Sequence, residues 1–207
     1  MSKNYCIHEN YVSRKEFATC DQTSHTDKFQ DEVYYAANAL FRDRGYETLL
    51  DIGCGSAYKL LKYFNDKKFV GLDLEPNLSY IKQKYPLCDF RESNFKNPPK
   101  EEFDLVICSD VIEHLLDPDD LLNFISNIKF KHLVLSTPER TVIQKLQRSF
   151  GWSVSTNGPP HNKMHIREWS FEELRNYLSE WFNIEYQFMT PNQVECQVVI
   201  ATPKKTL

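Results

Sequence analysis

The chain has 207 residues, of which 41% are hydrophobic, so it is long enough to bury the core of one domain. Its net charge of −4 argues against a general nucleic-acid binder, because such proteins need a basic face. No segment approaches the roughly 20 apolar residues of a membrane-spanning helix, and the N-terminus has no apolar signal run. The six cysteines contain no C-x-x-C spacing, which argues against a cysteine zinc site and indicates a reducing, cytoplasmic setting.

Residues 1–27 are polar and aromatic and show little regular period. We predict a short helix over residues 8–18 within them. Two interpretations of this N-terminal arm stay open: a flexible tail, or a cap that closes over the ligands. In the second interpretation Tyr11 contacts the substrate. The rest of the chain, residues 28–207, is predicted to form the main domain.

Residues 29–44 predict an amphipathic helix with Asp27 as its N-cap.

The next segment organises the rest of the chain. Residues 49–52 read as a buried strand that ends in a tight turn at Gly53 and Gly55. Because glycine has no Cβ, a ligand can lie against the backbone there, and a following helix start offers free N–H groups. This pattern predicts a site for a nucleotide-like ligand.

A helix over residues 56–64 and a strand over residues 69–73 follow the turn. The second strand ends in Asp73, where an acid is expected to accept hydrogen bonds from ribose hydroxyls. The dinucleotide fingerprint G-x-G-x-x-G wants glycine where this chain has Tyr58, so the loop alone does not select a dinucleotide.

Further strands and helices alternate through the remainder of the chain. Strands are predicted over residues 88–91, 103–108, 132–136, 184–189 and 195–202, and helices over residues 77–85, 118–128 and 171–181. Ser170 is the predicted N-cap of the last helix, with Glu173 completing a capping box. Residues 149–168 form a long irregular loop, which is typical of a functional or disordered segment. The order of elements matches an α/β, doubly wound sheet with a closing hairpin.

Two segments resemble the class I S-adenosylmethionine (SAM)-dependent methyltransferases. Asp51, Gly53 and Gly55 match the first motif, D-x-G-x-G-x-G, and Ala57 stands at its third glycine. Residues 109–118, SDVIEHLLDP, resemble the fourth motif in the form found in the ubiquinone-biosynthesis O-methyltransferase group. The resemblance implies a Rossmann-like, mostly parallel sheet of seven strands with an antiparallel last strand and helices on both faces.

The resemblance also implies SAM as cofactor, with S-adenosylhomocysteine (SAH) as product. The residues expected to bind it follow or end predicted strands: Asp51, Gly53, Gly55, Asp73, Leu74, Asn94, Ser109 and Asp110. Gly53 and Gly55 are expected to face the methionine part and Asp73 the ribose. Leu74 is expected to pack on the adenine, and Asn94 to recognise it. Since the carboxyl ends of parallel strands meet at one crevice, these residues are predicted to converge.

Transfer of a methyl group to a hydroxyl is helped by a base, for which histidine is suited. His165 is our first candidate and His114 the second, each against a purely structural role. Arg167 is expected to hold an anionic group of the acceptor, because its fork matches phosphate and carboxylate; the alternative is an ion pair with Glu168. Residues 158–169, GPPHNKMHIREW, resemble a set of methyltransferases encoded beside glycosyltransferases. This second resemblance implies a small polar acceptor such as a sugar or glycan precursor.

Three alternatives stay open at this point. Glu113 with Asp117, Asp119 and Asp120 suggests a metal site, but dense acids also favour a solvated helix start, and we expect no metal. A nicotinamide-dependent sugar oxidoreductase is a second alternative. A SAM-binding protein without catalytic activity is the third, because binding residues do not establish turnover.

Overall fold

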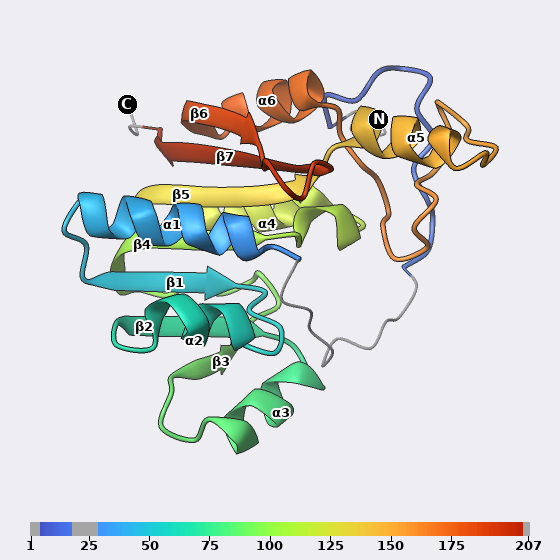
Figure 1. Ribbon diagram of the computed structural model, residues 1–207. Coiled ribbons are helices and arrows are strands. Elements are labelled where there is room, and N and C mark those ends of the chain that lie inside the picture. The colour runs from blue at the N-terminus through green and yellow to red at the C-terminus, as the bar shows by residue number, and fades with distance from the viewer. Residues whose placement is uncertain (1–4, 18–28, 205–207) are drawn as a thin grey trace.

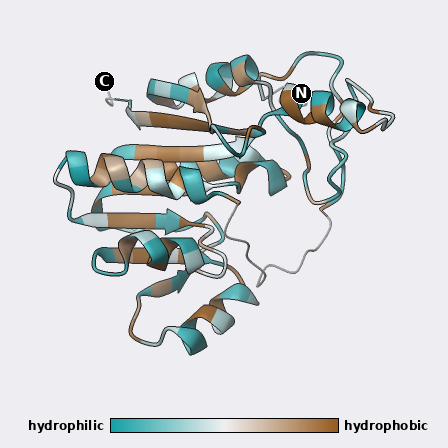
Figure 2. Ribbon diagram, viewed as in Figure 1, coloured by the Kyte–Doolittle hydropathy of each residue, from teal (hydrophilic) through white to brown (hydrophobic). Residues whose placement is uncertain are grey.

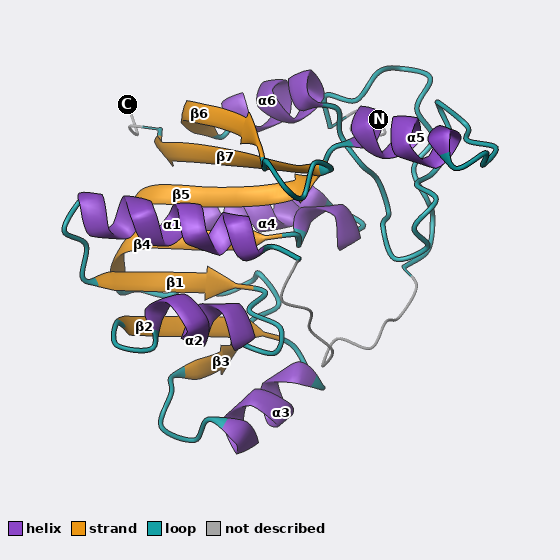
Figure 3. Ribbon diagram, in the orientation of Figure 1, coloured by secondary structure: helices purple, strands orange, loops and turns teal. Residues whose placement is uncertain are grey.

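The computed structural model describes residues 5–17 and 29–204, and seven strands within them form one sheet (Figures 1 and 3). Their order is β3-β2-β1-β4-β5-β7-β6. The strands are β1 (Thr48–Ile52), β2 (Lys68–Asp73), β3 (Phe90–Glu92), β4 (Glu102–Ser109), β5 (Lys129–Pro138), β6 (Phe182–Met189) and β7 (Cys196–Pro203). Strands β1 to β5 pair in parallel, whereas β7 is antiparallel to both of its neighbours. The predicted fold class is therefore confirmed.

Helices cover both faces of this sheet (Figure 1). They are α1 (Asp31–Asp43), α2 (Tyr58–Phe64), α3 (Asn77–Lys84), η1 (Ile112–His114), α4 (Pro118–Ser126), α5 (Arg140–Ser149) and α6 (Phe171–Ser179). Alternate strand residues point to opposite faces. Leu50 and Ile52 accordingly pack with α4 and α6, while Leu49 packs with α1, α2 and α3. Figure 2 shows the apolar central strands that this double burial requires.

The long polar segments gather at one end of the sheet. The strands β1, β2 and β4 end there, and their connecting turns face the arm of residues 5–17 and the loop of residues 150–169 (Figure 1). The arm lies along this loop: the Val12 N–H donates to the Asn157 carbonyl at 2.6 Å, and the Arg14 N–H to the Ile166 carbonyl at 2.8 Å. The arm and the loop are therefore one packed unit in this structure.

Several predicted elements need correction. The described part of residues 8–18 is irregular and not helical, since its backbone groups bond the loop instead. The third strand is Phe90–Glu92 and not residues 88–91. Helix α5 was not predicted; Glu139 caps it by accepting a hydrogen bond from the Val142 N–H at 2.6 Å. The expected N-cap Asp27 lies outside the described residues.

The predicted capping box of the last helix is confirmed. The Ser170 hydroxyl accepts from the Glu173 N–H, and the Glu173 carboxylate accepts from the Ser170 N–H. None of the helices within the described residues combines the length and the apolar character needed to cross a bilayer.

Candidate functional site

A cavity of about 1050 Å³ opens at the carboxyl ends of the parallel strands. Its wall comes from the turns after β1, β2, β3 and β4, from helix η1, and from residues of the arm and the long loop. The predicted site residues that line it are Gly53, Gly55, Asp73, Leu74, Ser109, Asp110, His114 and His165. The structure thus brings together most of the predicted site.

The glycine turn after β1 has the left-handed backbone that glycine allows. Gly53 has φ +74°, and a Cβ at this position would clash with the Val111 side chain. The Asp73 carboxylate at the end of β2 accepts from the Gly55 N–H at 2.6 Å and from the Leu74 N–H at 2.8 Å. The Asn77 side-chain amide also donates to Oδ1 of Asp73, at 3.1 Å. Asp73 therefore ties the two turns together, and its Oδ2 keeps a second lone pair for a ligand hydroxyl.

Asp51 lies behind the glycine turn and does not line the cavity. Its Oδ2 accepts from the Tyr34 hydroxyl at 2.8 Å, and its Oδ1 has no hydrogen-bond partner within the described residues. Burial raises the pKa of this carboxyl to about 7, with the nearby Asp73 charge adding to the shift. Tyr34 itself lines the cavity, so Asp51 is one hydrogen bond away from a bound ligand.

The end of β4 carries a strained residue that faces the cavity. Asp110 has φ +52°, a conformation that is costly without glycine and is found mostly where function requires it. Its carboxylate accepts from the Ser136 hydroxyl at 2.7 Å, and this hydroxyl is 2.9 Å from the hydroxyl of Ser109. The two strand ends hold Asp110 in place through this chain of hydroxyls.

Asn94 does not lie where it was predicted. It is exposed and outside the cavity, and its side chain accepts from the Lys96 N–H at 3.3 Å. Its neighbours Ser93 and Phe95 line the cavity instead. The reason is the backbone of the turn after β3: Phe95 has φ +63°, and this bend turns Phe95 inward against Phe124.

Glu113, His114 and His165 form a cluster that lines the same cavity, and each offers one ligand atom within 4.8 Å of the others. Glu113 is fully buried; its Oε2 accepts from the Thr137 hydroxyl at 2.9 Å, while its Oε1 has no hydrogen-bond partner within the described residues. Burial, together with the charge of Asp110, raises the pKa of Glu113 to about 8. These three residues are the described groups best arranged to hold a metal.

The orientation of the two histidines is fixed by their Nδ1 atoms. The His114 Nδ1 lies 2.9 Å from the Met164 carbonyl, and the His165 Nδ1 lies 2.6 Å from Oε1 of Glu168. Both partners accept hydrogen bonds, so each Nδ1 carries a proton, and in the neutral ring Nε2 is then an acceptor. The His165 Nε2 accepts from the side-chain amide of Asn162 at 3.0 Å. Glu168 is thus a positioning residue for His165.

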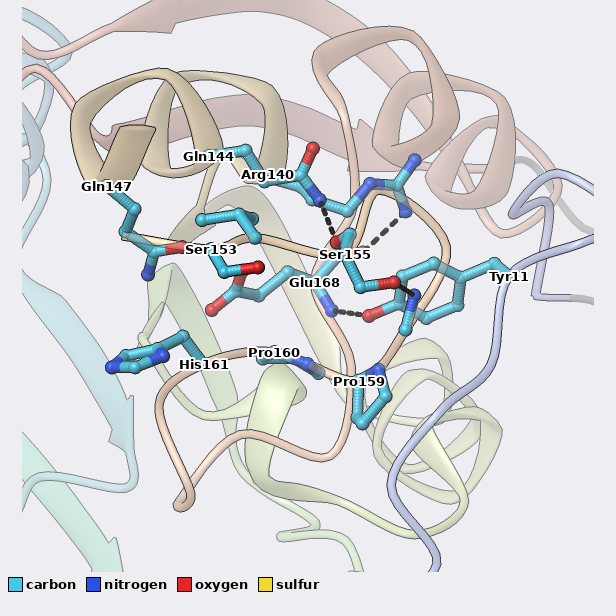
Figure 4. Close-up of a pocket in the computed structure, with 12 residues that line it drawn as sticks. Tyr11, Arg140, Gln144, Gln147, Ser153, Ser155, Pro159, Pro160, His161 and Glu168 are labelled. Carbon is cyan, nitrogen blue, oxygen red and sulfur yellow. Dashed lines mark hydrogen bonds between the residues drawn. The ribbon is translucent and has the colours of Figure 1, made fainter. Parts of the chain in front are cut away.

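A second, smaller cavity of about 130 Å³ lies beside the first, between α5 and the long loop (Figure 4). Gln147 and Glu168 line both cavities. Tyr11 lines only the smaller one: its hydroxyl accepts from the Glu168 N–H at 3.1 Å, and the Arg140 guanidinium lies 4.6 Å from its ring centre. Burial raises the pKa of Tyr11 to about 12. Tyr11 is therefore held near the site without touching the main cavity.

Arg167 lines neither cavity, contrary to its predicted role. It is buried, and its guanidinium donates to the carbonyls of Leu115 and Leu116, both at 2.9 Å, and to the Ser13 hydroxyl at 3.3 Å. It also lies 4.3 Å from the ring centre of Tyr5. Because these donors are already occupied, they do not hold an acceptor anion. Arg167 instead joins the arm to the turn after η1. The alternative ion pair with Glu168 is absent from the described contacts.

The acids after His114 serve the helix that they begin. Asp117 caps α4 by accepting from the Asp119 N–H at 3.0 Å, and Asp119 accepts from the Tyr177 hydroxyl at 2.5 Å. Glu168 was not predicted as a partner of His165, although the spacing of three residues between them is visible in the sequence. Glu113 was expected only as part of the acidic run, because its burial beside His165 depends on the distant loop.

A family model described as a methyltransferase domain matches residues 25–186 of the chain. No curated protein matches the chain.

Solved structures with the same fold have varied activities. Magnesium protoporphyrin IX methyltransferase from Synechocystis PCC 6803, solved with bound SAH, is 17% identical with a TM-score of 0.65, and 84% of each chain is covered. The small RNA methyltransferase HEN1 is 19% identical with a TM-score of 0.66, covering 92% of this chain and 27% of that one. The [4+2]-cyclase SpnF is 12% identical with a TM-score of 0.66, covering 97% of this chain and 90% of that one.

These structural likenesses show the fold, while the family model identifies the group. The expectation of a SAM-dependent methyltransferase, with SAM as its cofactor, is confirmed at this level. The narrower ubiquinone-biosynthesis group is not distinguished. The chain belongs to the methyltransferase domain family, within the class I SAM-dependent methyltransferases.

Proposed function

We propose that this protein transfers a methyl group from SAM to an oxygen of a small polar acceptor, such as a sugar or glycan precursor. The observation that carries the proposal is the single cavity that joins the glycine turn and Asp73 at one wall to His165 and Glu168 at the other. Its volume of about 1050 Å³ is sufficient for a nucleoside cofactor and a small acceptor together.

The residues at the cofactor wall fit SAM. The turn at Gly53 and Gly55 leaves room for the methionine part, Asp73 keeps lone pairs for the ribose hydroxyls, and the exposed Leu74 offers an apolar surface to the adenine. SAM supplies a methyl group on a sulfonium, which is reactive without help from the protein. The protein then contributes mainly position: it holds the acceptor oxygen in line with that methyl group.

His165 is proposed to act on the acceptor hydroxyl, with His114 beside it. The hydroxyl loses its proton as its oxygen takes the methyl group, and the Nε2 of His165, oriented by Glu168, is placed to receive that proton. The two rings lie 5.1 Å apart between centroids, so one hydroxyl can reach both. Tyr11 is proposed to contribute to acceptor binding through the smaller cavity, while Arg167 is no longer proposed to contact the acceptor.

The N-terminal arm of residues 1–27 and the loop of residues 149–168 are proposed to cover the acceptor. Phe17 from the arm and Asn162 from the loop line the main cavity, which supports this role. Amide hydrogen exchange should slow in both segments when SAH and an acceptor bind. Equal exchange with and without the ligands would reject the covering role.

A sugar-like acceptor is favoured over nucleic acid by the net charge of −4 and by the polar lining of the smaller cavity. The cytoplasmic setting remains part of the proposal and is supported by the absence of disulfides among the five described cysteines. The test is a screen of nucleotide sugars, free glycans, small phenols and RNA with labelled SAM. Methylation of a sugar supports the proposal, whereas activity restricted to phenols or to RNA rejects the acceptor class.

A SAM-binding protein without methyl transfer is the second candidate, because a cyclase shares this fold at a TM-score of 0.66. The two candidates differ at His165. A protein that only binds SAM does not need an oriented histidine for proton transfer. Replacement of His165 should then leave SAM binding unchanged and remove no activity. Titration with SAM and with NAD separates both candidates from the nicotinamide-dependent alternative.

A further inference from the structure

The cluster of Glu113, His114 and His165 contains a polar atom that the proposed function leaves unexplained. Oε1 of Glu113 is buried and has no hydrogen-bond donor within the described residues. Leaving a buried carboxylate oxygen unpaired is costly. The nearest candidate donor is the His114 ring, whose Nε2 lies 3.8 Å away, beyond hydrogen-bond distance.

We propose that Glu113, His114 and His165 bind one divalent transition-metal cation of the zinc type at the acceptor end of the cavity. The role of this cation in catalysis rests on the proposed function, whereas the existence of the metal site does not. It departs from the sequence-based expectation of no metal, which considered a different set of acids.

The ligand atoms are already prepared by a second layer of contacts. Metal-binding histidines usually donate their other ring N–H to a carbonyl or carboxylate, which fixes the ring and makes the free nitrogen a better ligand. Both histidines do this here, His114 to the Met164 carbonyl and His165 to Glu168. The Nε2 of His114 lies 3.8 Å from Oε1 of Glu113, and the Nε2 of His165 becomes available as a ligand when the Asn162 amide turns away.

The distances require a modest contraction on binding. The three ligand atoms lie within 4.8 Å of one another, whereas ligands of a tetrahedral Zn²⁺ lie roughly 3.4 Å apart. The amide of Asn162, which donates to the His165 Nε2, has to turn away. Asn162 is exposed on the long loop, so its side chain has room to do so.

The donor set selects the class of cation. Two imidazole nitrogens and one carboxylate are the ligands of catalytic zinc sites, which keep a fourth position open for water or substrate. Mg²⁺ prefers oxygen ligands and gives up its water shell reluctantly. Asp110 and Glu168 add negative charge around the cluster, as a cation requires. All three ligand residues line the cavity, so the open position faces the acceptor.

A bound cation changes how the acceptor hydroxyl is activated. The hydroxyl oxygen takes the open position, which lowers the pKa of the hydroxyl, and its proton leaves to water. The C–S bond of SAM breaks as the new C–O bond forms, and SAH and the methyl ether leave. In this state His165 is a ligand and does not itself receive the proton.

The test uses chelator-treated full-length protein, titrated with Zn²⁺ by calorimetry and with Co²⁺ by visible absorption. We expect one tight site per chain, and Co²⁺ bands of a four- or five-coordinate centre that excess Mg²⁺ does not abolish. Glu113→Gln and His114→Ala should each weaken Zn²⁺ binding by roughly 10- to 100-fold or more, because changes outside the ligand shell alone have that effect. His114 is partly exposed, so its variant should fold even if the Glu113 variant does not.

His161→Ala is the matched control, since it removes an exposed histidine of the same loop and should leave the site intact. Loss of Zn²⁺ binding in this control, unchanged binding in both ligand variants, or full methyl transfer by metal-free protein would overturn the proposal. SAM binding is measured in the same samples. Its absence would reject the proposed function while leaving the zinc titration interpretable.

Discussion

At the cofactor wall of the cavity the polar contacts join neighbouring strand ends, whereas at the acceptor wall they join segments far apart in the chain. Asp73 bonds Gly55, which lies 18 residues earlier in the turn after the adjacent strand β1. Arg14 bonds the His165 carbonyl across 151 residues, and Arg167 bonds the Leu115 carbonyl across 52. The first wall follows from a short motif, and the second exists only once the arm, η1 and the long loop are packed together. The family is therefore visible in the motif, but the acceptor is not.

The largest expected effect concerns the acceptor wall. His165→Ala should lower the turnover of methyl transfer by about 10²–10⁴, the range for a group that acts on a proton in the transition state. SAM affinity should stay unchanged, because His165 lies at the opposite wall. Steady-state rates and calorimetry measure the two quantities. A parallel loss of SAM affinity would mean that the two walls are not separable.

Arg167 tests whether the acceptor wall is held together as described. Arg167→Met removes the donors to the Leu115 and Leu116 carbonyls and to the Ser13 hydroxyl, three contacts that join the arm to the turn after η1. We expect the free energy of unfolding to fall by about 2–4 kcal/mol, as measured by denaturant titration. An unchanged stability with a raised KM for an anionic acceptor would instead restore the original prediction for this residue.

Asp73 tests the cofactor wall. Asp73→Asn keeps the size of the side chain but weakens the acceptors for the ribose hydroxyls and for the Gly55 N–H. SAM affinity should fall by about 1–3 kcal/mol, while the stability of the acceptor wall is unaffected. Asn94→Ala is the matched control, because Asn94 lies outside the cavity and its replacement should leave SAM affinity unchanged. Equal losses in both variants would contradict the placement of these residues.

The smallest expected effect is a proton change at Asp51. Its pKa is raised from 3.8 to about 7, so near neutral pH the free protein partly holds this proton. The cationic SAM favours the ionised carboxylate, and binding should release a fraction of one proton at pH 6–7. SAM affinity should rise as pH increases towards 7 and then level off. Calorimetry in buffers of different ionisation enthalpy measures the release, and Asp51→Asn should abolish it.

The same shift has a consequence for stability with the opposite pH trend. Because the folded protein holds the Asp51 proton more tightly than the unfolded chain, this group stabilises the fold most below its ordinary pKa. The contribution is lost as pH rises from about 4 to about 7. Unfolding of the native protein should therefore show a fall in stability over this range that is smaller in Asp51→Asn, where the similar contribution of Glu113 remains.

The sequence was sufficient for the cofactor wall because its signals are local. Gly53, Gly55 and Asp73 occupy fixed places at strand ends, and the order of strands alone brings them together. The prediction for Asn94 is less secure because it depends on where a short strand ends. The strand β3 has three residues and begins two positions later than predicted, and the bend at Phe95 directs a different side chain inward.

The acceptor wall was less predictable because its geometry depends on packing. His114 and His165 line the main cavity as their chemistry predicts, whereas Arg167 has the chemistry of an anion binder but lines neither cavity. Only the fold reveals that carbonyls of the turn after η1 already occupy its donors. Helix α5 was not predicted although Val142, Ile143 and Leu146 recur at helical spacing; these side chains are half-buried, and Arg140 is the one buried residue of the helix.

The most direct test of the central claim is a calorimetric titration of the native protein with SAH, beside a titration with NAD. The account predicts saturable binding of one SAH per chain, weakened in Asp73→Asn and unchanged in Asn94→Ala, with no heat of binding from NAD. Saturable NAD binding without any SAH binding would contradict it.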